Sequence, residues 1–382
     1  MLTFSSSSVM MSILFSNILL IILYFIFRDS RIMMEIGCKL LALFIGITVL
    51  RFLFPFETPC STNILIPEKL SDIMILCLKD TLIDIGNYEL SGFHILLIIW
   101  AVGSCIAMLR FLLACRSFRR RIKTQGMDIS MEEPYRSLLE EICIKHHKKN
   151  RFHIIKLSGI ASPMITGIRK PYILIPENFG MKEQDLYYIL RHETAHFFHQ
   201  DLLLRFFSEL LGILYWWNPF MILLKRQITT MLELRIDLQI TESPDPQERL
   251  NYLDCLLNAA KAGISAPAIP AISLCSAGES LLTQRFSIIM NSQKKKTCRK
   301  KQVLLSLFMA GLYFFSIFFI FEPSGSLPSE EEIFTVTPED SYLVENPDGT
   351  YDFYHDKIYQ STISRIDETL LDLPVYKKGE LQ

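Results

Sequence analysis

Five consecutive residues near the middle of the chain have the types and the spacing of a zinc-dependent hydrolase. His192 and His196 are four positions apart, so on a helix both imidazoles project from one face and can bind a single zinc ion. Glu193 follows the first histidine and can act as the general base on a water activated by that ion. The segment therefore predicts zinc as the cofactor, His192 and His196 as metal ligands, and Glu193 as the catalytic residue.

The residues around this segment predict that it lies on a helix. Gly180, Glu183 and Asp185 fit the start of that helix, because acidic residues are favoured in a first turn. Apolar residues then recur at helical spacing, including Leu186, Ile189, Leu190 and Phe197. The alternative interpretation is a buried helix whose histidines are merely hydrogen-bonded.

A catalytic zinc ion normally has three protein ligands and one open position, so a third ligand has to come from elsewhere in the chain. The sequence offers Glu233, followed one helical turn later by Asp237. On one helix face, Glu233 can bind the metal while Asp237 accepts the free ring N–H of a ligand histidine. Asn218 and Pro219 are suited to begin that helix, as its cap and its first residue. His199 is a rival third ligand, but its position close to the first helix face would strain the geometry.

The composition indicates a membrane protein. Half of the residues are hydrophobic (50%), and four apolar runs are each near the ~20 residues that a helix needs to cross a bilayer. The runs are Met10–Phe27, Cys38–Phe54, Phe93–Cys115 and Val303–Phe321. The first has no basic residue before it and no small-residue cleavage site, which argues against a signal peptide. Arg51 and Arg110 lie close to the ends of their runs, where long side chains can extend to the headgroups.

Basic residues predict how the spans are oriented. They cluster between the first two runs, after the third and before the fourth, whereas residues 57–92 contain only Lys69 and Lys79. The positive-inside rule then places both termini outside and residues 116–302 in the cytoplasm of a multi-pass cell-membrane protein. Because every cluster flanks an apolar run, membrane orientation explains the clusters better than direct nucleic-acid binding does.

A fifth apolar stretch, Leu202–Leu224, contains charged residues and ends near Trp216 and Trp217. Counting it as a span would move the predicted zinc ligands to opposite sides of the membrane. We therefore expect a helix that is buried in the zinc domain or lies in the inner-leaflet interface, with the tryptophans at headgroup depth.

The cytoplasmic part is expected to combine helices with a small sheet. Helices are predicted over Met131–Lys149, Pro246–Ala262 and Leu281–Met290, and strands over Arg151–Leu157, Ser162–Gly167 and Pro171–Pro176. The prolines favour an edge position for the last strand or a place at its ends. A sheet edge beside the zinc helix can accept an extended peptide as a further strand. The alternative is an ordinary sheet that only covers the helices.

Several motifs together resemble the BlaR/MecR-type antirepressor membrane metallopeptidases, over roughly Met10 to Phe321. The motifs are Ser162-Pro163 with Gly167, Pro171 and Pro176; His192 to His196; Trp217-Asn218-Pro219; and Glu233-Leu234 with Asp237. The resemblance implies a gluzincin-like site with His192, His196 and Glu233 on zinc and Glu193 as general base. It also implies a cytoplasmic transcriptional repressor as the class of substrate.

The chain departs from this family in two respects. Ile236 stands where members often have a cysteine, which is not a required ligand in this arrangement. The tail from Pro323 to Gln382 is too short for the penicillin-binding sensor domain of the family's β-lactam sensors and has no Ser-x-x-Lys motif. Acylation by β-lactams is therefore not expected.

The predicted fold class is a mostly α membrane protein with four transmembrane helices, an inserted cytoplasmic α+β zincin domain and a short outside tail. Its parts are three membrane helices within residues 1–115 with an outside loop at 57–92, the zinc domain at 116–302, the fourth helix at 303–321 and the acidic tail at 322–382. The sequence leaves the fold of the tail open. A disulfide between Cys60 and Cys77 and two free thiols are equally compatible with it.

The predicted activity is hydrolysis of peptide bonds in a cytoplasmic protein by a signal-transducing membrane zinc endopeptidase. Expected partners are that substrate and the lipid bilayer, and a homo-oligomer is compatible with the sequence. The alternatives are a quality-control or prenyl-protein membrane zinc protease, and a signalling scaffold that no longer cleaves. A transporter or channel is disfavoured by the scarcity of charges at mid-span. The loose segment Gly263–Ser280 and the following Leu281–Met290 also raise the hypothesis of self-cleavage.

Overall fold

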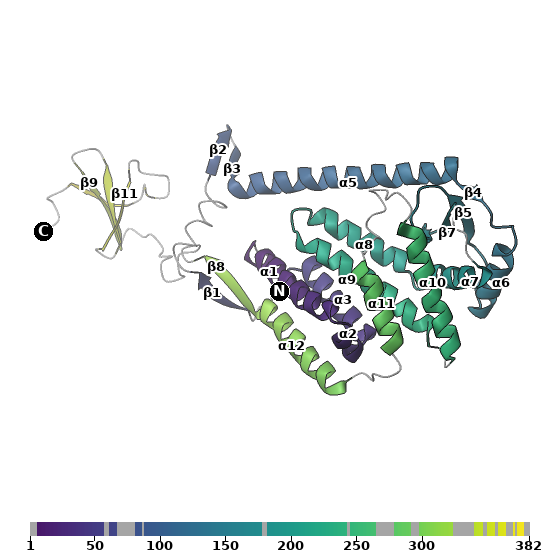
Figure 1. Ribbon diagram of the computed structural model, residues 1–382. Helices are drawn as coiled ribbons and strands as arrows, with labels where there is room; N and C mark the ends of the chain where they lie inside the picture. The colour runs from purple at the N-terminus through teal and green to yellow at the C-terminus, as the bar shows by residue number, and fades with distance from the viewer. Residues whose placement is uncertain are drawn as a thin grey trace. The chain divides into compact units, whose positions relative to one another are not determined.

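The structure, a computed structural model, has two compact units, each described here by itself. One unit comprises Met1–Ile66 and Ile73–Glu322, and the other comprises Pro67–Asp72 and Pro323–Gln382. The larger unit is mostly helical and contains the predicted metal ligands (Figure 1). The residues that the structure describes are 6–56, 61–66, 81–85, 88–177, 182–242, 245–264, 279–291, 298–323, 340–346, 350–355, 358–363, 370 and 373–377.

Helices form at each of the four predicted membrane runs. They are α1 (Ser6–Arg28), α3 (Cys38–Leu53), α5 (Gly92–Gln125) and α12 (Arg299–Phe318). Among the described residues, α1, α5 and α12 are each long and apolar enough to cross a membrane. The helix α3 has 16 residues and passes the same test only together with α2 (Ser30–Ile36), from which it is bent by 93°. Candidate membrane helices are therefore present, and the count of four spans stays a prediction.

Two of these helices differ in extent from the prediction. The helix α5 continues past Cys115 to Gln125, and its last turns pack on the sheet, where Ile122 is buried beside Ile155 and Arg121 donates to the Ser158 carbonyl at 2.9 Å. The helix α12 begins within the basic cluster and ends at Phe318. Residues Phe319–Pro323 form strand β8, which pairs with β1 (Thr62–Ile66).

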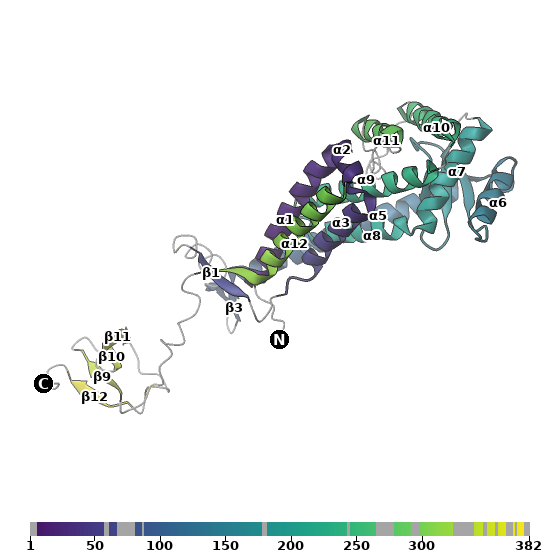
Figure 2. The same ribbon diagram turned by 90° about the horizontal axis from the view of Figure 1, so that it is seen from below.

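The interpretation of Arg51 as a residue that extends to the headgroups is wrong. Its side chain is buried between α3 and α12, with 2% of the residue exposed. The guanidinium donates to the Ser316 hydroxyl at 3.0 Å and to the Ser316 carbonyl at 2.6 Å. A buried cation needs such partners, and here they come from the neighbouring helix, so Arg51 joins two helices of the bundle. Figure 2 shows α1, α3 and α12 side by side.

The apolar stretch Leu202–Leu224, for which one helix of the zinc domain or of the membrane interface is expected, belongs to two helices, and the second starts at Asn218 and Pro219 as predicted. These are α8 (Asp201–Leu214) and α9 (Phe220–Ile240), which pack against each other as a hairpin (Figure 1). The break occurs at Pro219, which has no N–H and disfavours helix at the residue before it. Asn218 caps the second helix, because its side-chain oxygen accepts from the Phe220 N–H at 3.0 Å. Because α9 runs back along α8, the hairpin brings Glu233 of α9 to the end of α7, where its carboxylate lies 3.4 Å from His196.

The hairpin packs closely against α5 at one glycine, which gives a testable prediction. An added Cβ at Gly103 would lie 2.3 Å from the ring of Trp216, whereas at Gly46 it would meet no atom within 4 Å. We expect Gly103→Ala to lower the midpoint of thermal unfolding in detergent micelles, since overpacking typically costs about 1–3 kcal/mol. Gly46→Ala has the same gain in helix propensity and serves as the control. Equal midpoints for the two variants would contradict this contact.

A four-stranded sheet lies beside the predicted zinc helix. Its order is β4-β5-β7-β6, in which β5 and β7 are parallel and the outer pairs are antiparallel. The strands are β4 (Met127–Asp128), β5 (His153–Leu157), β6 (Met164–Thr166) and β7 (Tyr172–Pro176). Of the two positions predicted for the proline-flanked strand, the structure shows prolines at its ends and not an edge strand, because Pro171 precedes β7 and Pro176 ends it, so neither removes a donor from its middle. The edge beside the zinc helix is β6.

Helices enclose this sheet on the side of the predicted metal site. The helix α6 (Tyr135–Lys145) buries Leu138, Leu139, Ile142 and Cys143, the face predicted from its periodicity. The helix α7 (Glu183–Phe198) carries the HExxH segment between the sheet and α9. The helices α10 (Pro246–Ile264) and α11 (Glu279–Asn291) form where helices were expected, and α10 packs on α7 while α11 packs on α9.

The smaller unit contains a second sheet, so the described part of the tail is folded. Its order is β11-β10-β9-β12, formed by β9 (Ser341–Glu345), β10 (Tyr351–His355), β11 (Ile358–Ile363) and β12 (Val375–Lys377). Leu343, Phe353 and Leu373 form its buried core. In the larger unit, β2 (Thr81–Ile85) and β3 (Tyr88–Ser91) pair as a further antiparallel ribbon. Cys60 and Cys77, which the sequence left open as a disulfide, lie outside the described residues.

Candidate metal centre

Three predicted ligands meet between α7 and α9. The Nε2 atoms of His192 and His196 are 3.1 Å apart. The Glu233 carboxylate lies 3.2 Å from His192 Nε2 through one oxygen and 3.4 Å from His196 Nε2 through the other. Both histidines are buried, and Glu233 is nearly so. Among the described residues these three form the one group of three or more such side chains whose donor atoms all lie within 4.8 Å of one another.

These distances fit a single zinc ion. Two donors that each bind tetrahedral zinc at about 2.0–2.1 Å lie about 3.3 Å apart, close to the separations between the three donors here. Two nitrogens and one carboxylate oxygen are also donors that zinc accepts in sites that keep an open position for water. The residues present therefore fit the metal that the sequence predicts.

The second nitrogen of each histidine fixes the orientation of the ring. His196 Nδ1 donates to the Asp201 carboxylate at 2.8 Å. His192 Nδ1 lies 2.9 Å from the Tyr252 hydroxyl, which itself donates to Asp237 at 2.6 Å. Since the hydroxyl proton is used on Asp237, the hydroxyl oxygen accepts from His192. Both Nε2 lone pairs then point toward the space that a cation would occupy, as is usual for ligand histidines.

Asp237 therefore acts on His192 through an intermediate group that the sequence did not predict. Its carboxylate is 3.7 Å from His192 Nδ1, and Tyr252 of α10 bridges the two. Asp201, at the start of α8, takes the corresponding place beside His196 and was also missed. An acidic residue opening the helix after the HExxH segment is the one sequence signal for it. Tyr252 gives no such signal, because it comes from a distant helix.

Three arginines compensate the acidic residues of the site. Arg285 of α11 donates to both oxygens of Asp237, at 2.6 and 2.7 Å, and lies 3.2 Å from the Glu233 carboxylate. Arg205 of α8 donates to the other oxygen of Glu233 at 2.7 Å. Arg235 pairs with Asp201 in the same way. Every carboxylate that contacts a histidine of the site is thus also bound by an arginine.

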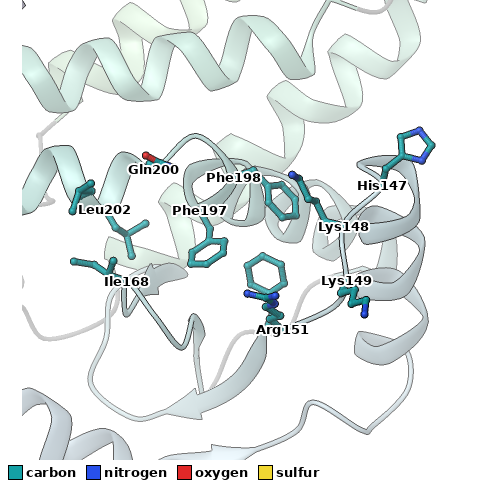
Figure 3. Close-up of a pocket in the computed structure, with 11 residues that line it drawn as sticks. His147, Lys148, Lys149, Arg151, Ile168, Phe197, Phe198, Gln200 and Leu202 are labelled. Atoms are coloured by element: carbon teal, nitrogen blue, oxygen red, sulfur yellow. The ribbon is translucent and has the colours of Figure 1, made fainter.

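His199, the rival third ligand, is not part of this cluster. Its Nε2 lies 2.7 Å from the side-chain oxygen of Gln239, at an exposed position after the end of α7. Beside that helix end lies a cavity of about 550 Å³ with aromatic and basic walls (Figure 3). Phe152, Phe197 and Phe198 form its aromatic part, and none of the three clustered donors lines it.

Burial and neighbouring charges shift the pKa values of Glu193, Glu233 and His196. Burial raises the pKa of the Glu193 carboxyl, against the opposing effect of His192 and His196. Burial by itself also raises the pKa of Glu233, but the charges of His196 and Arg285 outweigh it and hold that pKa well below its ordinary range. For His196, burial lowers the pKa, whereas the charge of Glu233 and the hydrogen bond to Asp201 outweigh that effect and raise the pKa to about 9. Without metal, the site therefore holds a proton where the metal would sit.

This protonation predicts that zinc binding releases a proton. Because the pKa of His196 is raised to about 9, the metal-free ring is protonated at neutral pH and must lose that proton to bind zinc. Zinc affinity should therefore fall by about tenfold for each pH unit below that value. Calorimetry in buffers of different ionisation enthalpy measures the proton directly. The exposed His153 provides a control in His153→Gln, which should release the same proton, and a buffer-independent enthalpy would refute the prediction.

Comparison with protein families supports the same site. The family model described as BlaR1 peptidase M56 matches residues 79–289, which is more than half of the chain. The chain belongs to this peptidase family. The matched segment contains the whole centre, from His192 on α7 to Arg285 on α11, and the resemblance seen in the sequence is thereby confirmed.

Two curated relatives are named as a regulatory protein and as a methicillin resistance protein. The chain is 27% identical over 176 residues to the regulatory protein BlaR1 of Bacillus licheniformis, covering 44% of this chain and 29% of the relative. It is 25% identical over 185 residues to the methicillin resistance mecR1 protein of Staphylococcus aureus, covering 47% and 31%. The chain thus spans less than a third of the length of the curated relatives it matches, and no sensor domain is shown by these matches.

Proposed function

We propose that this M56 peptidase is an integral-membrane zinc endopeptidase that cuts a cytoplasmic protein as part of a regulatory signal. The observation that carries the proposal is the convergence of His192, His196 and Glu233 at zinc-ligand separations, beside the partly buried carboxyl of Glu193. The family membership adds independent support for peptidase chemistry.

In the proposed hydrolysis, three residues bind the metal and a fourth transfers the proton. A zinc ion bound by His192, His196 and Glu233 would polarise the scissile carbonyl and lower the pKa of a water toward ~7. Glu193 takes a proton from the attacking water and later gives it to the leaving amine. Its raised pKa suits both roles, because a carboxyl that holds its proton more tightly is a better base before attack and can still deliver the proton afterwards.

The sheet edge offers a place for the substrate backbone. Strand β6 pairs with β7 on one side only, and it lies next to α7. An extended peptide can add to such an edge through main-chain hydrogen bonds, with alternate side chains facing the protein. We propose that substrate binds in this way along Met164–Thr166, which brings its scissile carbonyl toward the metal centre.

The identity and location of the substrate rest on the charge pattern and on the relatives. The positive-inside rule places residues 116–302 in the cytoplasm, so a cytoplasmic protein is the proposed substrate. The relatives' names, regulatory protein and methicillin resistance protein, support a regulatory target such as a transcriptional repressor. The short tail, outside by the same rule, would then carry or receive the stimulus.

Comparison of protein N-termini in cells tests this proposal. Cells that carry the native chain should contain new cytoplasmic N-termini that are absent from cells carrying Glu193→Gln, and the exposed Glu183→Gln on the same helix should behave like the native chain. If the native and Glu193→Gln cells give the same set of N-termini under inducing conditions, the chain is a scaffold and not a protease.

The hypothesis that the chain cleaves itself stays a prediction, and the same comparison of N-termini tests it. Residues 265–278 of the loose segment lie outside the described residues, and the following Leu281–Met290 form most of α11. Leu281, Ile288 and Ile289 are buried there, so a cut within α11 requires that helix to unwind first. A native N-terminus within the chain that is missing in Glu193→Gln would establish self-cleavage.

A further inference from the structure

The α8–α9 hairpin carries large apolar side chains that remain exposed against the part of the chain that the structure describes. Phe206, Phe207, Leu214, Trp216, Trp217 and Ile222 are between 37% and 71% exposed. They continue the apolar surface of α5, which packs along α8 and whose own apolar window is 0% buried. Two adjoining helices with such faces require an apolar environment on that side of the protein.

The contact between α5 and the hairpin shows how far the hairpin extends along a membrane helix. Trp100 of α5 donates to the Leu214 carbonyl at 2.8 Å, and Trp216 donates back to the Trp100 carbonyl at 3.3 Å. About 24 Å of helix separates Trp100 from Arg116, the first residue of the basic cluster on α5. The turn of the hairpin therefore lies far from the basic end of α5.

Contacts with α3 and α1 also place the turn of the hairpin far from the basic ends of those helices. The Tyr215 hydroxyl donates to the Phe52 carbonyl at 2.7 Å, and Phe52 lies about 20 Å along α3 from Lys39. The Asn218 amide donates to the Asn17 side chain at 2.9 Å, and Asn17 lies about 17 Å along α1 from Arg28. Three helices thus place the turn beyond the middle of a hydrocarbon core that is about 30 Å thick.

We propose that α8 and α9 form a re-entrant membrane hairpin. It enters the hydrocarbon core from the zinc-domain side, turns at Tyr215–Pro219 and returns to the same side. Its exposed apolar face contacts lipid acyl chains. The proposal places Trp216 and Trp217 deeper than the headgroup level expected from the sequence, because the turn meets α1, α3 and α5 well away from their basic ends.

The polar groups of the hairpin are arranged as an apolar surrounding requires. Glu209 of α8 and Lys225 of α9 form an ion pair at 2.7 Å within the hairpin. The lysine reaches it across Gly212, where a Cβ would lie 2.5 Å from the ammonium nitrogen. Charged residues inside membranes are usually paired with one another in this way. At the turn, the N–H groups of Tyr215, Asn218 and Phe220 donate to Leu211, Tyr215 and Asn218 oxygens, which reduces the cost of placing an irregular backbone there.

The hairpin places the metal centre at the membrane surface, whether or not the centre is catalytic. Its base contains Asp201, which binds His196, and Arg205, which binds Glu233. Both groups lie within about two turns of the start of α8, so the ligand cluster sits where the hairpin leaves the bilayer. A substrate of this centre would therefore have to approach along the membrane surface.

Tryptophan fluorescence tests the position of the turn, because the chain has only 3 tryptophans, of which Trp100 and Trp216 lie at the contact with α5 and Trp217 lies in the turn. The full chain carrying Trp100→Phe and Trp217→Phe retains Trp216, and the one carrying Trp216→Phe and Trp217→Phe retains Trp100 as the reference on a membrane helix. Each is reconstituted in phosphatidylcholine vesicles with bromine midway along the acyl chains.

We expect the emission of Trp216 to be quenched as strongly as that of Trp100, with little quenching by iodide in the water. Strong iodide quenching of Trp216 would place the turn at the interface, and quenching by neither agent would place it inside protein. Either result would overturn the proposal.

A second pair of variants is independent of fluorescence. Ile222 on α9 is 71% exposed, and Leu250 on α10 is 47% exposed. If Ile222 faces lipid, Ile222→Asp should sharply reduce the yield of folded, membrane-inserted protein, because a carboxylate is costly in the hydrocarbon core. Leu250→Asp, on a helix of the zinc domain, should leave that yield unchanged. Equal yields from the two variants would mean that the hairpin face contacts water.

Discussion

Replacing Glu193 by glutamine is expected to slow peptide cleavage by about 10²–10⁴-fold, the usual contribution of a general acid–base residue. Glutamine has nearly the same shape but cannot accept a proton from the attacking water. The metal ligands His192, His196 and Glu233 are unchanged in this variant. The purified variant should therefore retain stoichiometric zinc while its turnover is lost.

Zinc content by mass spectrometry and cleavage rate have to be measured on the same preparation. Glu183→Gln is the matched control, since Glu183 is exposed in the first turn of the same helix and should affect neither quantity. A Glu193→Gln protein that cleaves at the native rate would show that another group removes the proton. A variant that loses zinc would instead show that Glu193 has a role in holding the site together.

Replacing Arg285 by methionine is expected to reduce the free energy of unfolding by about 3–5 kcal/mol, the usual cost of leaving one partner of a buried ion pair alone. Arg285 is 13% exposed and binds Asp237, which is completely buried. It also lies against Glu233, so its loss leaves two carboxylates close to each other in a site with little water. Without metal, this repulsion should push Glu233 away from the histidines.

A double variant separates the ion pair from the packing of α11. Arg285→Met together with Asp237→Leu removes both charges and should regain part of the lost stability. Arg136→Met is the control, because Arg136 and Glu140 form an exposed pair worth less than about 1 kcal/mol. Thermal unfolding in micelles followed by circular dichroism compares the proteins. A stability of Arg285→Met equal to that of Arg136→Met would mean that the buried cation is not needed.

The metal ligands can be predicted from the sequence because their geometry is largely local. Residues four apart on a helix share a face, which places His192 beside His196 and Glu233 beside Asp237 whatever the rest of the fold is. That the two helices must meet follows from the chemistry, since zinc needs a third ligand. The structure brings Glu233 to the histidines as this reasoning requires.

The parts that the sequence did not reveal depend on tertiary packing. Tyr252 and Arg285 reach the site from α10 and α11, and neither belongs to a pattern that local spacing can detect. Asn218 and Pro219 indicate the start of α9 within the apolar stretch Leu202–Leu224, but the packing of α8 back against α9 depends on tertiary contacts. The prolines around β7 are compatible with an edge strand and with strand ends, and the pairing of β7 on both sides decides for the ends.

The position of α11 has a consequence for how a signal could cross the membrane. Gln284 donates to the carbonyl of Phe27 at 2.8 Å, at the end of the first candidate membrane helix, while the adjacent Arg285 lies 3.2 Å from the carboxylate of Glu233, the proposed third metal ligand. Neighbouring residues of one short helix therefore connect a transmembrane segment to the electrostatics of the metal. A sliding movement of α1 by a few ångströms would draw this cation away from Glu233 and change how strongly that carboxylate holds its ion.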